Sequence, residues 1–145
     1  MKNIFILAII CLTGPLTAQV NWDSVMETKS ARQFLATIYE NGNDMNICVD
    51  INGSAHQLIS GAIVKEAHGI VDYILQNGNP DLSLICNDMT ILQYGIQYGD
   101  ADLVKQLLSA GADPNQTSES GQSAYDLAIQ LDKPVIVGYL KSLTK

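Results

Sequence analysis

Residues 90–115 read TILQYGIQYGDADLVKQLLSAGADPN, and this stretch decides the fold because its pattern recurs along the chain. Moving 33 positions in either direction brings similar residues into register. The matched sets are Gly95 with Ala62 and Ala128, Val104 with Val71 and Val137, and Leu107 with Ile74 and Leu140. A weaker copy, around Leu35 and Ile38, lies 36 positions before the next one. The longer offset implies three extra residues in the loop between Asn43 and His56. A fixed period of this length is typical of proteins built from stacked repeats.

Each copy carries the signals of two short helices joined by a turn. Val104, Leu107 and Leu108 lie three and four positions apart, so their side chains share one helical face. Gly111 follows this helix, and Gly78 holds the same place one copy earlier. We expect both glycines to end their helix in the left-handed conformation, which costs glycine nothing sterically. A pair of helices this short cannot bury its apolar face alone, so the units must stack side by side.

A hydroxyl side chain precedes the first helix of each of the last two copies. Thr90 and Ser123 stand where such a side chain accepts a hydrogen bond from a free backbone N–H of the first helical turn. We therefore expect first helices to begin directly after these two residues.

This pattern resembles the ankyrin repeat, whose motif runs Gly-x-Thr-Pro-Leu-His-x-Ala and then Val-x-x-Leu-Leu-x-x-Gly-Ala-x-x-Asn. The best match carries Thr90, Leu92, Gly99, Val104, Leu107, Leu108, Gly111, Ala112 and Asn115. The proline of the motif is absent, because Leu58, Ile91 and Ala124 stand in its place. The resemblance implies an all-α ankyrin-repeat solenoid of about four helix-turn-helix units with short loop fingers. The units are about 20–53, 54–86, 87–120 and 121–143.

The first residues have the pattern of a secretory signal peptide. Lys2 supplies a positive charge, an apolar run follows to Leu12, and small residues end the segment at Ala18. The apolar run is shorter than the roughly 18 residues that a membrane-spanning helix needs. We therefore expect a signal peptide over residues 1–18, and a single repeat domain over residues 19–145 that is periplasmic or secreted and does not insert into a membrane. A buried N-terminal helix is the alternative.

The charge balance bears on the class of partner. Without residues 1–18 the chain has 7 Lys and Arg against 15 Asp and Glu. Such a charge repels nucleic acid and anionic membranes, and it favours a basic protein as partner. Acidity is also a common means of keeping a protein soluble.

Two cysteines, Cys48 and Cys86, remain in the expected mature domain. An even number in an oxidising compartment permits a disulfide, and two buried free thiols are the alternative. Equivalent fingers of stacked units lie roughly 10 Å apart, which exceeds the span of about 7 Å between Cα atoms that a disulfide tolerates. The three extra residues before His56 would carry Cys48 toward Cys86, so we predict the bridge.

The sequence offers little catalytic chemistry. The two histidines, His56 and His68, belong to no spaced metal signature, and both are expected in solvated turns. No nucleophile elbow and no phosphate-binding loop is present. Carboxylates are scattered over the predicted loops, and a hydrolase using them is the alternative that we weigh. We predict no catalytic residue, no metal and no cofactor.

The resemblance implies that partners bind the loop fingers and the outward face of each first helix of the stack. Tyr98 and Met89 are the expected anchors, because an exposed aromatic ring beside a flexible thioether is typical of interfaces; packing of Tyr98 against a neighbouring unit is the alternative. The other candidate partner-binding residues are Asp50, Ser54, His56, Val64, Lys65, Asn87, Gln97, Glu119, Ser120, Gln122 and Gln130.

These observations favour a non-catalytic protein–protein interaction module outside the cytoplasm. The family resemblance admits an immunity-type protein that neutralises a toxin. It equally admits a protector of a periplasmic enzyme or a secreted effector aimed at host proteins. Self-association of repeat stacks through weakly capped ends is a further alternative.

Overall fold

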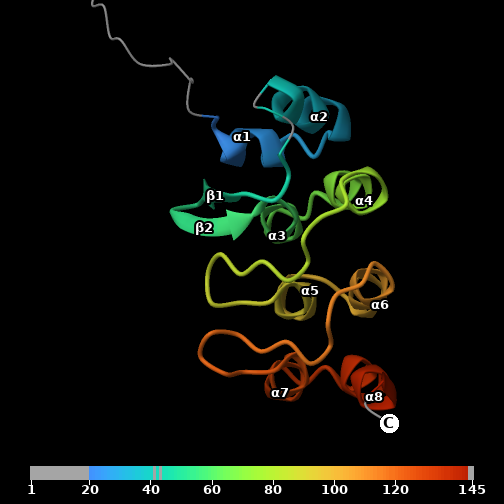
Figure 1. The fold of residues 1–145 in the computed structure, drawn as a ribbon. Helices are drawn as coiled ribbons and strands as arrows, with labels where there is room; N and C mark the ends of the chain where they lie inside the picture. Colours follow the sequence, from blue (N-terminus) through green and yellow to red (C-terminus); the bar gives the residue numbers. More distant parts are fainter. Residues whose placement is uncertain (1–19, 41, 43, 144–145) are drawn as a thin grey trace, which may run out of the picture.

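A computed structural model describes residues 20–40, 42 and 44–143. This part of the chain contains eight helices and one two-stranded sheet (Figure 1). The helices are α1 (Trp22–Glu27), α2 (Ala31–Glu40), α3 (Leu58–Val64), α4 (His68–Asn77), α5 (Ile91–Tyr98), α6 (Ala101–Ser109), α7 (Ala124–Gln130) and α8 (Pro134–Leu143). The strands are β1 (Cys48–Ile51) and β2 (Ser54–Gln57). The expected signal peptide, residues 1–18, lies outside the described residues.

The helices follow one another as consecutive packed pairs. Figure 1 shows α3, α5 and α7 in one column and α4, α6 and α8 in a second column beside it. In the first column α3 packs on α5 and α5 on α7, while in the second α6 packs on α8. Residues of each pair therefore meet mainly their own partner helix and the neighbouring pairs, as expected for stacked units.

The hairpin of β1 and β2 corrects the all-α prediction. The strands are antiparallel, with Val49 opposite His56 and Ile51 opposite Ser54. The turn between them is Asn52-Gly53, and both residues have positive φ angles, 56° and 77°. This dipeptide favours a two-residue hairpin turn because both residues tolerate positive φ. The extra residues before His56 therefore form a strand pair rather than an irregular loop.

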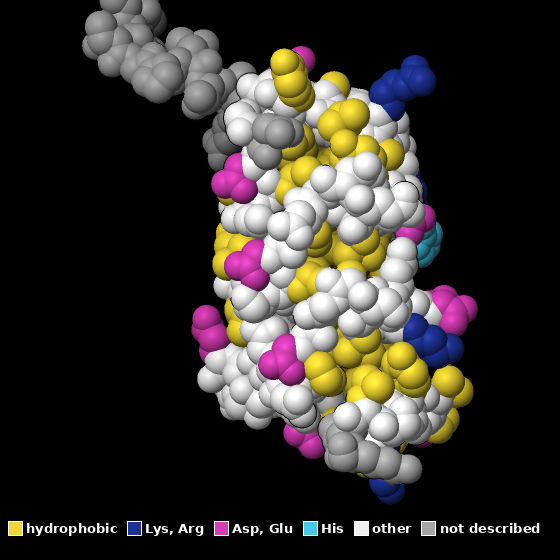
Figure 2. Space-filling view, turned by 45° about the vertical axis from the view of Figure 1, so that its right-hand side comes forward, with side chains coloured by type: hydrophobic (Ala, Val, Ile, Leu, Met, Phe, Trp, Pro, Cys, Tyr) yellow, Lys and Arg dark blue, Asp and Glu magenta, His cyan; other side chains and the backbone are white. Residues whose placement is uncertain are grey.

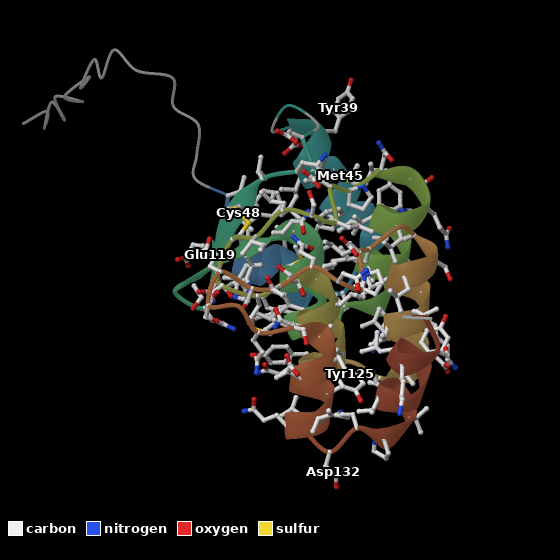
Figure 3. All side chains as sticks on the ribbon, turned by 60° about the horizontal axis from the view of Figure 1, so that its bottom comes forward. Tyr39, Met45, Cys48, Glu119, Tyr125 and Asp132 are labelled. Atoms are coloured by element: carbon white, nitrogen blue, oxygen red, sulfur yellow. A yellow bond between two sulfur atoms is a disulfide. The ribbon has the colours of Figure 1, made fainter. Side chains whose placement is uncertain are left out.

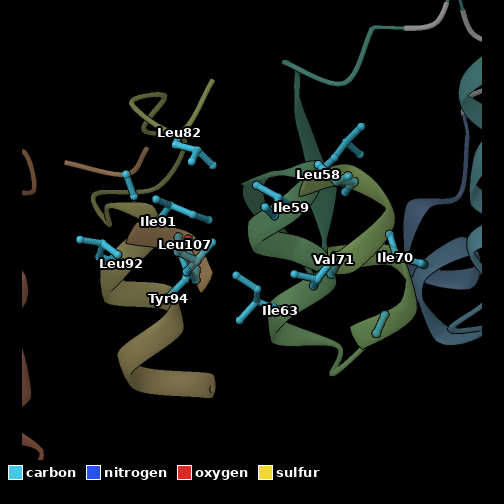
Figure 4. Close-up of a cluster of buried hydrophobic side chains, with 14 of the residues drawn as sticks. Leu58, Ile59, Ile63, Ile70, Val71, Leu82, Ile91, Leu92, Tyr94 and Leu107 are labelled. Atoms are coloured by element: carbon cyan, nitrogen blue, oxygen red, sulfur yellow. The ribbon is translucent and has the colours of Figure 1, made fainter. Parts of the chain in front are cut away.

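The core runs through the stack without interruption. In Figure 4, Ile59 of α3 faces the side of α5 that carries Ile91, whereas Leu58 lies on the side of α3 away from α5. Ile63 points from α3 into the space between the two helices. All of these side chains are buried, and Leu107 of α6 is fully buried behind α5. Apolar burial between neighbouring pairs is therefore the main stabilising contribution.

The helix ends show which sequence signals are confirmed. Thr90 caps α5: its Oγ1 accepts from the Gln93 N–H, and Gln93 Oε1 accepts from the Thr90 N–H at 2.7 Å. Ser123 caps α7 through the same reciprocal arrangement. Gly111 follows α6 with φ of 105°, as expected. The prediction for Gly78 is wrong, because its φ is −93°.

Gly78 is required for space rather than for a left-handed backbone. A Cβ atom at this position would lie 2.7 Å from the Ile74 carbonyl oxygen and 2.8 Å from Met45 Sδ. The left-handed conformation falls one residue later, at Asn79, with φ of 42°. Asparagine tolerates this conformation better than most residues, so the chain turns there.

Candidate functional site

One side of the molecule is built from projecting segments, which we call the finger face. It comprises the β1–β2 hairpin, the loops 78–90 and 111–123, and the adjoining helices α3, α5 and α7. Figure 1 shows the hairpin and both loops on the same side of the first helix column. Stacking of the helix pairs therefore brings three segments that are distant in sequence to one surface.

Hydrogen bonds link each finger to the next. The Gln57 side chain donates to the Asp81 carbonyl oxygen at 2.6 Å. One unit later the Gln93 side chain donates to the Gln122 carbonyl oxygen at 3.1 Å. The Ser120 N–H also donates to the Asp88 carboxylate at 2.8 Å. These contacts fix the spacing of the fingers.

The predicted site did not include the residues that make these bonds, which are Gln57, Gln93, Asp81 and Asp88. Gln57 and Gln93 are buried polar residues, and each directly precedes or lies within a first helix. Their position at the helix starts is the signal that could have found them, since a buried amide there must find hydrogen-bond partners.

A disulfide joins the first finger to the second. Cys48 on β1 is bonded to Cys86 in the 78–90 loop, with the Cα atoms 5.7 Å apart. The separation lies within the span that a disulfide tolerates. The hairpin thus brings Cys48 close to the loop of the following unit.

The predicted partner-binding residues all lie on or beside the finger face, but they differ in accessibility. Those exposed are Asp50, Asn87, Gln97, Tyr98, Glu119, Ser120 and Gln130. Those half-buried are Ser54, Val64, Lys65, Met89 and Gln122. The structure brings some of them into contact: the Gln122 side chain donates to Gln130 Oε1 at 2.9 Å. The expected anchor Met89 packs partly against the core, which reduces the area that it offers.

The prediction that His56 lies in a solvated turn is wrong. It lies on β2 and is only 6% exposed. Its ring packs edge-on against Tyr94 of α5, with ring centroids 5.5 Å apart. Side chains alternate in direction along a strand, so the hairpin directs His56 into the stack while Asp50 on β1 remains exposed.

Tyr94 extends the His56 contact to the surface. Its ring stacks on Tyr98, one turn later in α5, at a centroid distance of 6.2 Å. Tyr98 is 44% exposed, and it also lines a hollow with His68 and Val71 of the preceding unit. Two buried atoms of this column, His56 Nδ1 and the Tyr94 hydroxyl, make no hydrogen bond of good geometry among the described residues.

Burial shifts the ionisation of the column. Desolvation lowers the pKa of His56, and the charges of Asp50 and Asp23 partly oppose this shift. Desolvation also raises the pKa of Tyr94, which the Asn87 side chain partly opposes. Both groups are therefore held in their neutral forms.

Lys65 is engaged within the protein. Its Nζ lies 3.0 Å from the Asp23 carboxylate and 3.4 Å from that of Glu27, and it donates to Asn52 Oδ1 at 2.9 Å. The hydrogen bond with Lys65 lowers the pKa of Asp23, and the same bond raises the pKa of Lys65. Lys65 therefore ties α1 to the hairpin turn, which leaves its charge largely neutralised.

His56 makes the stability of the protein depend on pH. Because its pKa is lower in the folded protein, only the unfolded chain binds a proton as the pH falls through the ordinary histidine range. The contribution of His56 to the free energy of unfolding is therefore fully present above about pH 6.5. It decreases as the pH falls below that value, by at most about 1.4 kcal/mol per pH unit. Denaturant unfolding of the His56→Phe variant should show a shallower loss than the wild type between pH 7 and 5. The matched control substitution is His68→Gln, which removes an exposed histidine.

Within the described ranges, no group of three or more His, Cys, Asp or Glu side chains is placed to hold a metal ion. None of the helices in this part of the chain is both long and apolar enough to cross a membrane.

The comparison with known proteins agrees with the repeated helix pairs. Residues 87–119 match the family model described as the ankyrin repeat. This stretch covers the second finger's end, α5, α6 and most of the third finger. No curated protein matches the chain. Ankyrin repeats are generally non-catalytic modules that bind other proteins, and the match supports one ankyrin repeat over residues 87–119 of this chain.

Proposed function

We propose that the protein is a non-catalytic module that holds a basic protein against its finger face, outside the cytoplasm. The observation that carries this proposal is the separation of charge. Residues 42–64, 78–98 and 111–130 form the fingers and first helices, and they contain no Lys or Arg. Their carboxylates, all exposed, are Asp44, Asp50, Asp81, Asp88, Asp113, Glu119 and Asp126.

The cations lie elsewhere. In the described part of the chain they occupy the second helices and the turns, at Lys29, Arg32, Lys65, Lys105, Lys133 and Lys141. Figure 2 shows Asp and Glu side chains without Lys or Arg along the left-hand edge of one view, and Lys and Arg side chains together with further Asp and Glu on the right. A surface of one sign steers and selects a partner of the opposite sign.

The finger carboxylates keep their charge because the loops stabilise it. Hydrogen bonds from Ser83 lower the pKa of Asp81, and the Ser120 backbone N–H lowers that of Asp88. These bonds also shape the loops, which is a sufficient structural reason for aspartate at both positions. Loop shape alone does not require that lysine and arginine be absent from all three fingers, however, and a basic partner accounts for that.

Export is part of the proposal. The signal-like residues 1–18 and the Cys48–Cys86 disulfide support it, because disulfides persist in oxidising compartments such as the periplasm. Among exported protein-binding modules, the more specific proposal is an immunity-type protein that neutralises a basic toxin. A protector of a periplasmic enzyme and a host-directed effector remain alternative forms, distinguished by what the partner does once it is identified.

Tyr98 is the expected anchor of the bound partner. The Tyr98→Ala substitution removes a half-exposed ring whose loss opens no core cavity, so we expect partner affinity to fall about 30-fold with little change in stability. Titration calorimetry with the identified partner measures the affinity. Tyr39→Ala is the matched control, because Tyr39 is an exposed tyrosine on α2 and lies away from the finger face. Unchanged affinity in the Tyr98 variant would remove this residue from the interface.

The deciding experiment is capture of the partner with the tagged protein from its native cells, followed by mass spectrometry. Asp81→Asn with Asp88→Asn and Asp113→Asn removes three finger charges while keeping an oxygen that can accept each loop hydrogen bond. Asp72→Asn with Asp102→Asn and Asp132→Asn removes the same charge outside the fingers. A basic partner retained by the second variant and lost by the first supports the proposal. A partner retained equally by both variants, or one that is acidic, contradicts it.

A further inference from the structure

Hydrogen bonds from three parts of the chain meet at the turn of the first finger. The Gly53 N–H donates to Asp50 Oδ1 at 3.1 Å, and Lys65 Nζ donates to Asn52 Oδ1 at 2.9 Å. The Asn52 N–H donates to both carboxylate oxygens of Asp23, each at 3.1 Å. The turn therefore has a carboxylate at the backbone nitrogen of Gly53 and an ammonium group at the side-chain carbonyl of Asn52.

These two contacts bear on the chemistry of an asparagine that is followed by glycine. The backbone nitrogen of the glycine can attack the side-chain carbonyl carbon of the asparagine and close a five-membered imide. The nitrogen must lose its proton, and the carbonyl oxygen gains negative charge as the ring forms. A carboxylate in contact with the N–H can take the proton, and a cation at the oxygen stabilises the charge. Asp50 and Lys65 are placed for these two tasks.

The turn is open to the reactant and the product of this chemistry. Asn52 and Gly53 are both exposed, so water reaches them. A Cβ atom built on Gly53 would meet no atom within 4 Å, so the space beside its backbone is free for a leaving group.

Lys65 Nζ is a second nitrogen near the Asn52 carbonyl group. The hydrogen bond to Asp23 raises the pKa of Lys65. The nitrogen is therefore held as an ammonium group, which has no lone pair with which to attack a carbonyl carbon. Gly53 is the better nucleophile for this reason, and Lys65 serves as the cation.

A second Asn-Gly pair, Asn77-Gly78 at the end of α4, provides a comparison within the same chain. The Gly78 N–H donates to the Ile74 carbonyl oxygen at 2.8 Å, as in a helix. The Asn77 side chain donates through Nδ2 to the Tyr73 carbonyl oxygen at 3.1 Å. A neutral carbonyl is too weak a base to take the Gly78 proton, so this pair has the same dipeptide without the same assistance.

We propose that the Asn52-Gly53 turn is a self-modifying site, in which the Gly53 nitrogen closes a ring on the Asn52 side chain. Asp50 takes the proton from the Gly53 nitrogen as this nitrogen bonds to Asn52 Cγ. The bond from Cγ to the amide nitrogen breaks, and that nitrogen takes up the proton and leaves as ammonia. Water then opens the imide to leave aspartate or isoaspartate at position 52. The net reaction consumes one water molecule and releases one ammonia molecule, whatever the finger face binds.

The modification changes the first finger. Figure 3 shows Cys48, where the hairpin begins, on the same side of the molecule as Glu119 of the third finger. Either product adds a negative charge beside Asp23 and Asp50, and isoaspartate also adds a methylene group to the backbone of the turn. The register of β1 and β2 depends on the length of that turn. The reaction therefore alters both the charge and the shape of the finger face.

The test is mass spectrometry of peptides from the protein incubated at neutral pH, with fragment masses that locate each conversion of amide to carboxylate. Position 52 should convert about tenfold faster in the folded protein than in the chain unfolded by guanidinium chloride, because unfolding removes both contacts. Position 77 should convert more slowly in the folded protein than in the unfolded chain. Conversion at position 52 that is equal or slower in the folded protein would overturn the proposal.

Two substitutions distinguish assistance from simple loosening of the turn. Asp50→Asn keeps an oxygen that can accept from the Gly53 N–H but removes the base, and Lys65→Met removes the cation. Each should slow the conversion at position 52 about tenfold or more. Contacts that only hold the turn rigid would give the opposite result, faster conversion in both variants, and this would contradict the proposal. Lys105→Met removes a cation from a surface ion pair on α6 and should convert at the wild-type rate.

Hydroxylamine distinguishes the two nucleophiles. It opens an imide but leaves an amide between two side chains intact. An intermediate that has lost ammonia and is opened by hydroxylamine supports attack by Gly53. A product that has lost ammonia and resists hydroxylamine would be a cross-link between Lys65 and Asn52, and it would overturn the assignment of Gly53 as the nucleophile.

Discussion

Replacing Cys48 and Cys86 by serine is expected to lower the free energy of unfolding by about 3–4 kcal/mol. The disulfide closes a loop with a sequence separation of 38 residues. Its loss returns to the unfolded chain the conformational freedom that the cross-link removes, and the chain-entropy relation gives this magnitude for a loop of that length. Denaturant unfolding of the double variant beside the wild type measures the change.

Reduction of the wild type provides the control for this prediction. Dithiothreitol should lower its stability to nearly that of the double serine variant and should not affect the variant itself. Equal stability of oxidised and reduced wild type would contradict the prediction and would mean that the hydrogen bonds between the fingers suffice to hold the hairpin. The bond from Gln57 to the Asp81 carbonyl oxygen is the strongest reason to consider that outcome.

Leu107→Ala is expected to lower the free energy of unfolding by about 2–5 kcal/mol. Leu107 is fully buried in α6. A Cβ atom on Gly95 of α5 would lie 2.9 Å from Leu107 Cδ1, so the two helices are already in close contact. They cannot move much closer to fill the cavity, and incomplete collapse places the cost toward the upper part of the range.

The control is a surface leucine on α2, which, like α6, is the second helix of its pair. Leu35 of α2 is more than one third exposed, so Leu35→Ala should change stability by less than about 1 kcal/mol. Denaturant midpoints of both variants decide the comparison. A Leu107→Ala variant no less stable than Leu35→Ala would show that the α5–α6 contact is looser than these distances indicate.

The repeat period predicted most of the fold because equivalent positions in successive units are buried against neighbouring helices in the same way. Val104 and Leu107 are buried where the helical spacing places them, and the hydroxyls of Thr90 and Ser123 cap the helices expected of them. The hairpin was missed because the helical register ended before it. The Asn52-Gly53 turn signal is present in the sequence, but a helical period does not include it.

The candidate site was less predictable because sequence register gives position and not orientation. Tyr98 lies on the surface, as expected for an anchor, yet His56 is turned inward by a strand that the register did not contain. Met89 and Lys65 are engaged with the core and with Asp23, respectively. Such contacts come from neighbouring units, and a single repeat pattern does not encode them.

The bonds between successive fingers bear on the thermodynamics of recognition. A loop surface that must order itself on binding loses conformational entropy, which subtracts from affinity. Here the disulfide and the hydrogen bonds from Gln57 and Gln93 have ordered the loops during folding. Binding then involves little reorganisation of this chain, and the heat-capacity change should follow the apolar area buried between two preformed surfaces. Any large conformational change on binding is therefore expected in the partner and not in this chain.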